Sequence, residues 1–104
     1  MKQLKQLQQG DVNIVKISEL PKKCKAINTD IIREGEATGH AHRIVGSDFK
    51  LYQQGQLILA RIMSGDCAIV HEEHKTIELS QGDYAFSPTV EYDHFAEESR
   101  MVRD

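Results

Sequence analysis

Short apolar stretches separated by Gly, Asp or Pro are the feature that most limits what this chain can fold into. They recur about every 8 to 12 residues and are rich in Val, Ile, Leu, Phe and Tyr, which is typical of β-strands joined by tight turns. The pattern predicts an all-β fold, a small barrel or sandwich. Strands are expected over 12–17, 30–33, 49–52, 57–63, 68–70, 76–79 and 84–86, and the first few residues are the only helical candidate.

The length of the chain limits how much apolar surface it can bury. With 104 residues, it has room for one domain, expected to span residues 1–104. A core of this size gives a small margin of stability, and the apolar stretch 57–63 could leave an edge in need of cover, so a homodimer is expected. The positions expected to be buried include Val12, Ile14, Leu57, Leu59, Ile69, Ile77 and Phe86.

The charge and composition of the chain indicate which classes of partner and which cellular location to expect. The formal net charge is −3, with 13 Lys and Arg against 16 Asp and Glu, whereas general nucleic-acid-binding proteins are normally basic. No apolar stretch approaches the length of a membrane span, so a cytoplasmic protein is expected. The two cysteines do not make a disulfide framework, and the apolar neighbours of Cys67 predict a buried, unreactive thiol.

Histidines carry the clearest chemical signal in the sequence. Four of the five form two close pairs, His40 with His42 and His71 with His74, while His94 stands apart. On a β-strand, side chains two positions apart point to the same face, so the rings of His40 and His42 are expected to lie side by side. That arrangement suits two ligands of one metal ion.

The second pair needs a bend in the chain. On a continuous strand, the spacing of three between His71 and His74 would send the two rings to opposite faces. A hairpin with Glu72 and Glu73 at its tip would make the two histidines opposed cross-strand neighbours, and a longer loop or a single helical turn could also bring them together. The string is not the His-Glu-x-x-His zinc motif, so it assigns no general-base role to Glu72.

Imidazole nitrogen favours transition metals over magnesium and calcium. The two pairs therefore predict a site for a divalent transition metal, with zinc, nickel, iron and copper all open. A polar pocket without metal, a surface that binds a partner, and incidental surface histidines are the alternatives. The predicted ligands are His40, His42, His71 and His74.

The arrangement of histidine, glycine and proline resembles the cupin superfamily of small metal-binding β-barrels. His40 and His42 match its His-x-His motif, with Gly35 one place late, and Gly82 and Pro88 match the start of its second motif. Gly46 and Ser47 stand where the glutamate ligand is found in cupins, Val90 replaces a glycine, and Asp93 occupies the expected histidine position, one residue before His94. The resemblance implies a site of His40, His42 and His94, with His71 or His74 in place of the missing glutamate.

A second resemblance concerns three short strings, Gly39–His42, His71–His74 and Glu91–Phe95. They are similar to strings in small bacterial and phage proteins without an assigned activity. Together, these observations favour a binding module that recognises a metal, a small molecule or a protein partner. A metal-dependent cupin-like enzyme acting on a small molecule, and an RNA-associated or phage accessory protein, are the alternatives.

Overall fold

A computed structural model describes residues 2–34 and 39–88, and all regular structure within them is β-strand. The predicted all-β fold is confirmed. No helix in these residues is long and apolar enough to cross a membrane. The strands are β1 (Gln3–Gln9), β2 (Val12–Ile17), β3 (Lys25–Ile27), β4 (Ile31–Glu34), β5 (Ala41–Val45), β6 (Phe49–Gln54), β7 (Leu57–Ile62), β8 (Ala68–Val70), β9 (Ile77–Glu78) and β10 (Gly82–Pro88).

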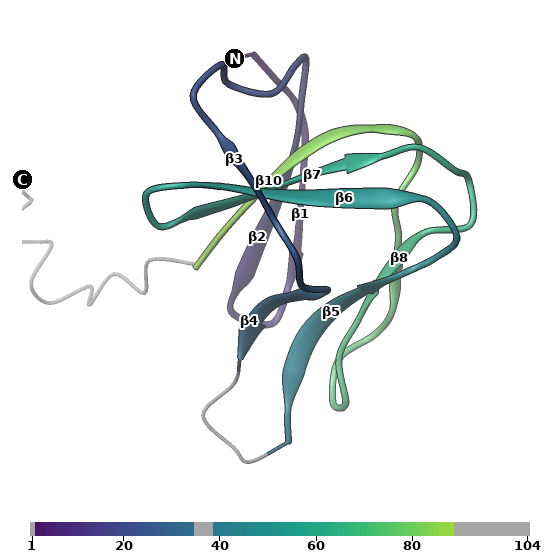
Figure 1. Cartoon of the computed structure of the whole chain (residues 1–104). Helices are drawn as coiled ribbons and strands as arrows, with labels where there is room; N and C mark the ends of the chain where they lie inside the picture. Colours follow the sequence, from purple (N-terminus) through teal and green to yellow (C-terminus); the bar gives the residue numbers. More distant parts are fainter. Residues whose placement is uncertain (1, 35–38, 89–104) are drawn as a thin grey trace, which may run out of the picture.

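The strands form two sheets whose neighbouring strands are antiparallel. Six strands are ordered β1-β2-β10-β7-β6-β3, and four are ordered β4-β5-β8-β9. In Figure 1 the larger sheet forms the upper part of the molecule, and β4, β5 and β8 lie below it. The chain crosses from one sheet to the other after β3, β5, β7 and β9, so both sheets are built from segments distributed along the sequence.

The main core is shared by the two sheets. In β2, Val12 and Ile14 are buried on one face, and they belong to the same cluster as Ile44 of β5 and Ile69 of β8. This arrangement follows from the period of two along a strand, which places alternate side chains on the same face. The buried members are Val12, Ile14, Ile32, Ile44, Leu51, Ala60, Ile62, Cys67, Ile69, Leu79, Tyr84 and Phe86.

A smaller apolar cluster forms around intervening positions of the larger sheet. Ile17, Leu59 and Ala85 are buried there, and Leu20 and Cys24 from the connection between β2 and β3 pack against them. Because apolar residues occupy both alternating sets of positions, the central strands read as nearly continuous apolar runs.

The structure corrects some expectations drawn from the sequence. The N-terminal segment, the helical candidate, is strand β1, paired with β2 from Gln3↔Ile17 to Gln9↔Val12. The hairpin turns at Gly10, where glycine adopts the φ of 58° at little cost in free energy. The pairing of β1 with β2 overrides the helical preference of the Lys- and Gln-rich segment. Strand β3 was not predicted. Leu57 and Ile77 are partly rather than fully buried.

Gly46, directly after β5, lies against Cys67, directly before the neighbouring strand β8, where no room is left for a side chain. Its φ is +145°, and a Cβ there would lie 2.5 Å from Sγ and 2.8 Å from Cα of Cys67. Cys67 is itself 2% exposed, which confirms that its thiol is buried. Any larger residue at Gly46 must therefore displace a backbone atom of the core.

We expect Gly46→Ala to lower the free energy of unfolding by about 2 kcal/mol or more, because it combines backbone strain with a steric clash. Urea denaturation monitored by circular dichroism measures the loss. Gly55→Ala is the matched control, since Gly55 also has a positive φ, +61°, but no atom lies within 4 Å of its added Cβ. That variant should lose only about 1 kcal/mol. Equal losses in the two variants would contradict the described packing at Gly46.

Candidate histidine site

Three segments of the chain meet at one end of the molecule, the lower end in Figure 1. They are the turn between β1 and β2, the start of β5, and the loop of residues 71–76 between β8 and β9. His42 lies in β5, and His40 immediately precedes that strand. His71 and His74 lie in the loop, so the longer loop, not a two-residue hairpin tip, joins the two strands.

The four predicted ligands come together at this end. The ring centroid of His71 lies 4.3 Å from that of His42, 4.7 Å from that of His74 and 5.8 Å from that of His40. The rings of His42 and His74 are 6.1 Å apart and nearly parallel, at 9°. Residues separated by about thirty positions in the sequence therefore form one cluster, which we call the histidine cluster.

The buried side chain of Gln9 fixes the proton on one nitrogen of His42. The amide nitrogen of Gln9 donates to the carbonyl oxygens of Ile69, at 3.0 Å, and Lys75, at 2.8 Å. Because carbonyl oxygens only accept, the amide orientation is settled and Oε1 of Gln9 must face Nδ1 of His42, 2.8 Å away. Nδ1 of His42 is therefore the donor, and a neutral ring carries its lone pair on Nε2.

Asp11 faces that second nitrogen. Its Oδ1 lies 3.0 Å from Nε2 of His42, and its Oδ2 accepts a hydrogen bond from Nε of Arg33 at 3.0 Å. Partial burial opposes ionisation of Asp11, but the hydrogen bond from Arg33, together with the one that His42 donates when its ring is protonated, outweighs it and lowers the pKa of the carboxyl below 3.8. Asp11 is thus a carboxylate at neutral pH.

The balance of influences on His42 favours its neutral form. Its side chain is 1% exposed, and burial lowers its pKa below the ordinary 6.5, whereas the hydrogen bond with Asp11 raises it only in part. Proximity to His71 and His74 lowers it further. At neutral pH, Nε2 of His42 therefore presents a lone pair toward the carboxylate of Asp11.

Two glutamates attach the loop to β5. Oε1 of Glu72 accepts a hydrogen bond from the backbone N–H of Ala41 at 2.9 Å, and this bond lowers the pKa of Glu72. Oε2 of Glu73 lies 3.7 Å from Nδ1 of His40. The backbone N–H of Glu73 donates to Nδ1 of His71 at 3.0 Å, so a neutral His71 carries its proton on Nε2. These contacts hold the loop histidines against β5.

Sequence reasoning identified the histidines but not the residues of the β1–β2 turn that contact them. Gln9, Gly10 and Asp11 form this turn, and a Cβ at Gly10 would lie 2.5 Å from Nε2 of His74, so only glycine lets that ring pack so closely. The string Gln-Gly-Asp occurs again at 81–83. Only the first copy contacts the histidines, and nothing in the string itself distinguishes the two.

The described side chains do not present a finished metal centre. Among residues 2–34 and 39–88, no three His, Cys, Asp or Glu residues are arranged to hold a metal ion. The physical reason lies in the ring geometry: His42 and His74 are nearly parallel, and Nδ1 of His71 already accepts a hydrogen bond. The metal ligands therefore remain a prediction. Gly35 and His94 of the cupin-like pattern, and the string 91–95, lie outside the described residues.

Comparison with known proteins gives a family without an assigned activity. Residues 8–88 match the model of a family described as a domain of unknown function, DUF8820. This match covers β2 to β10 and includes both histidine pairs and the Gln9–Asp11 turn. No curated protein and no solved structure matches the chain.

The lowered pKa of His42 makes stability depend on pH. In the unfolded chain His42 titrates near 6.5, so at pH values between its folded and unfolded pKa the unfolded state binds more protons. The free energy of unfolding therefore rises with pH in this window. The contribution of His42 to stability is lost as the pH falls below 6.5. Asp11 stays ionised there, because its own pKa is below 3.8.

We expect urea denaturation with a chelator present to show lower stability at about pH 5 than at about pH 7. His42→Gln should reduce this difference, because the titrating group is gone, and His40→Gln is the matched control that keeps it. Stability that increases on acidification in the parent protein would instead mean that the ion pair of protonated His42 with Asp11 outweighs the burial of the ring.

Proposed function

The chain belongs to the DUF8820 family, and we propose that it is a binding module that holds a divalent transition metal at the histidine cluster. The observation that carries the proposal is the approach of two electron-rich atoms, Nε2 of His42 and Oδ1 of Asp11, to 3.0 Å. When the ring is neutral, these atoms repel each other unless a cation binds both. A transition metal supplies that cation and favours imidazole as a ligand.

The distance between the two atoms suits neighbouring ligands of one ion. Metal–ligand bonds of about 2.1 Å, meeting at angles between a right angle and the tetrahedral value, separate adjacent ligand atoms by roughly 3.0 to 3.4 Å. The separation of 3.0 Å between Nε2 of His42 and Oδ1 of Asp11 falls at the short end of this range. The pair could therefore ligate without a large movement of β5 or of the β1–β2 turn.

Gln9 supplies the outer support that such a site needs. Histidine ligands of metals commonly donate their second ring N–H to an oxygen, which fixes the orientation of the ring and the nitrogen that binds. The hydrogen bond from Nδ1 of His42 to Oε1 of Gln9, at 2.8 Å, has this form. It leaves Nε2 as the ligating atom.

The loop histidines complete the proposed ligand set. His74 is exposed, lies outside the strands, and stacks 6.1 Å from His42, so rotation of its side chain can direct a nitrogen toward the ion. His71 is closer, at 4.3 Å, but must first release the backbone N–H of Glu73. His42 and Asp11 thus form the fixed half of the site, and the loop supplies the adjustable half. A set of nitrogen and oxygen ligands suits zinc and nickel.

Titration of untagged protein with Zn²⁺ or Ni²⁺ by isothermal calorimetry tests the proposal. We expect one ion per chain, with affinity in about the micromolar range, and a loss of about tenfold or more in His42→Ala, Asp11→Asn and His74→Ala because each removes a ligand. Gln9→Met should also weaken binding, by about tenfold, because the ring of His42 loses its support. Thermal unfolding of each metal-free variant separates a lost ligand from a lost fold.

His94→Ala discriminates between the two candidate ligand sets. It should leave metal affinity unchanged if His42, Asp11 and the loop histidines hold the ion. A large loss in His94→Ala, with Asp11→Asn unaffected, would support the cupin-like set of His40, His42 and His94 instead. Absence of stoichiometric uptake at about 100 μM metal, well above a micromolar dissociation constant, would contradict metal binding altogether.

A further inference from the structure

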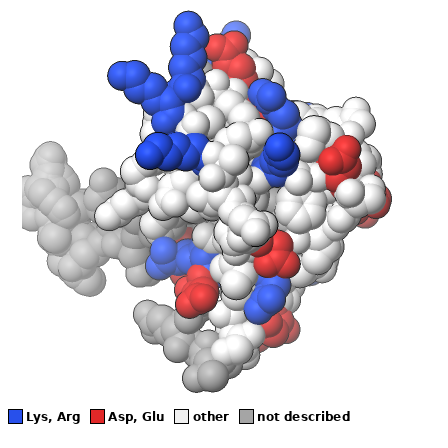
Figure 2. All heavy atoms as spheres, in the orientation of Figure 1, with Lys and Arg blue, Asp and Glu red and all other residues white. Residues whose placement is uncertain are grey.

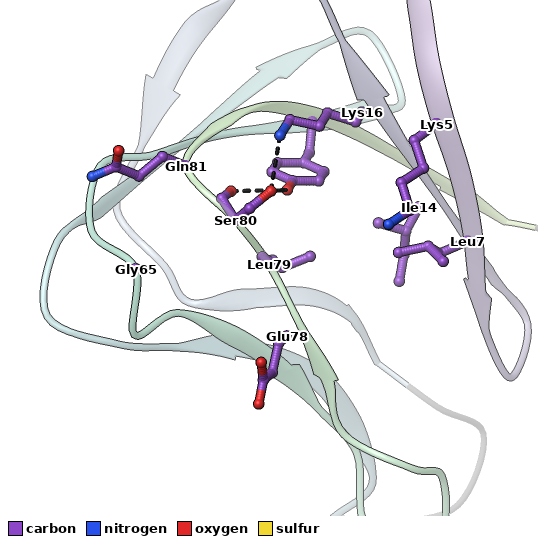
Figure 3. A pocket seen from close by; sticks show the side chains of 10 residues that line it. Lys5, Leu7, Ile14, Lys16, Gly65, Glu78, Leu79, Ser80 and Gln81 are labelled. Atoms are coloured by element: carbon purple, nitrogen blue, oxygen red, sulfur yellow. Dashed lines mark hydrogen bonds between the residues drawn. The ribbon is translucent and has the colours of Figure 1, made fainter.

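A second site lies on the same hairpin but away from its turn. A pocket of about 580 Å³ opens between the β1–β2 hairpin and the segment that leads from β9 into β10, and its lining includes none of the four clustered histidines (Figure 3). This volume is in the range of small-molecule sites. Leu7, Ile14 and Leu79 form its apolar part.

Two lysines enter this pocket from neighbouring strands. Lys5 of β1 and Lys16 of β2 are direct cross-strand partners. The pair Leu7 and Ile14 lies two residues away along each strand. Like charges placed directly opposite each other destabilise a sheet. Within the described part of the chain neither lysine forms an ion pair, so the structure holds two adjacent positive charges without a neutralising group.

The polar end of the pocket offers hydrogen-bond donors. Nζ of Lys16 donates to Oγ of Ser80 at 2.8 Å, and the hydroxyl of Tyr84 donates to the backbone oxygen of Ser80 at 2.8 Å. The Ser80 hydroxyl must then donate to the Tyr84 oxygen, 3.1 Å away, so both hydroxyl protons are committed. The ammonium group of Lys16 keeps further N–H donors at this end, and Figure 3 shows the ammonium group of Lys5 nearer to Leu7 and Ile14.

Other parts of the structure keep Lys16 in place. Its side chain passes over Gly82, where a Cβ would come within 2.7 Å of Cε of Lys16, and its Nζ lies 5.8 Å from the centre of the Tyr84 ring. Glu78, the one carboxylate among the lining residues, lies at the other end of the pocket in Figure 3, away from Lys16. The positive charge of Lys16 is therefore separated from the one carboxylate of the lining.

Figure 2 shows how charged side chains are distributed over one face of the molecule. Lys and Arg side chains gather toward the upper end of that face, and basic and acidic side chains are mixed toward the lower end, where β4 and β5 lie in Figure 1.

We propose that this pocket binds a small amphipathic anion, with its carboxylate or phosphate group on Lys5 and Lys16 and its apolar body against Leu7, Ile14 and Leu79. The ligand neutralises the opposed lysines and covers the apolar part of the pocket. The proposal is independent of metal binding, because it uses neither the histidines nor Asp11.

Chemical-shift titrations of labelled protein with octanoate and with octyl phosphate, in the presence of a chelator, test this site. We expect saturable shifts in β1, β2 and residues 79–84, and the tighter of the two probes identifies the preferred head group. Octanol and inorganic phosphate should bind roughly tenfold more weakly or not at all, because each satisfies only one part of the pocket. Octanol binding as tightly as octanoate, or no saturable shifts at about 5 mM of either anion, a concentration that reveals even millimolar affinity, would overturn the proposal.

Lysine variants locate the charge that matters. Lys5→Met should weaken anion binding by roughly tenfold, and Lys5→Arg should preserve it, because arginine keeps the charge. Lys25→Met on β3 is the matched control and should bind like the parent. The thermal midpoint of Lys5→Met should be unchanged or higher, since a like-charge pair is relieved. If Lys5→Met bound the anions as tightly as the parent protein, the proposal would be overturned. The lysines would then serve only to keep an edge strand soluble.

Discussion

The buried amide of Gln9 joins the two sheets at the histidine end of the molecule. It is 2% exposed, lies at the end of β1 in the larger sheet, and bonds to His42 of β5 and to the backbone of Ile69 and Lys75. One side chain thereby fixes the proton on His42 and the position of the loop that carries His71 and His74. An apolar residue there would remove the hydrogen-bond partner of the buried His42 ring N–H and of the Ile69 carbonyl, and a buried polar group left without a partner costs about 1 to 3 kcal/mol.

The same face of β1 contributes to both proposed sites. Lys5, Leu7 and Gln9 alternate with outward-facing residues, so the strand passes from a charged group, through an apolar one, to a buried amide. In the two proposals, the lysine end would hold an anion and the glutamine end would support a metal-binding histidine. This face of the hairpin is thus polar at both ends and apolar in the middle.

Most of the fold was predictable because local chemistry determines it. Short runs of β-branched, leucine or aromatic residues bounded by turns predicted β2, β6, β7, β8 and β10 closely. The Lys- and Gln-rich sequence of β1 carries no strand pattern and favours a helix instead. The pairing of histidines was visible as spacing. Gln9 and Asp11 were not, because they contact His42 across 33 and 31 residues, and only the pairing of strands determines such contacts.

The pairing of β2 with β10 also determines when the larger sheet can form. These strands are neighbours from Asp83↔Ile17 to Pro88↔Val12, although about seventy residues separate them in the chain. During synthesis the β1–β2 hairpin therefore waits with one unpaired edge, rich in Val and Ile, until nearly the whole domain has emerged. Contacts of such long sequence separation slow folding. Nascent chains that stop before β10 would present this edge to one another, so the exposure of β2 is the step at which assembly competes with aggregation.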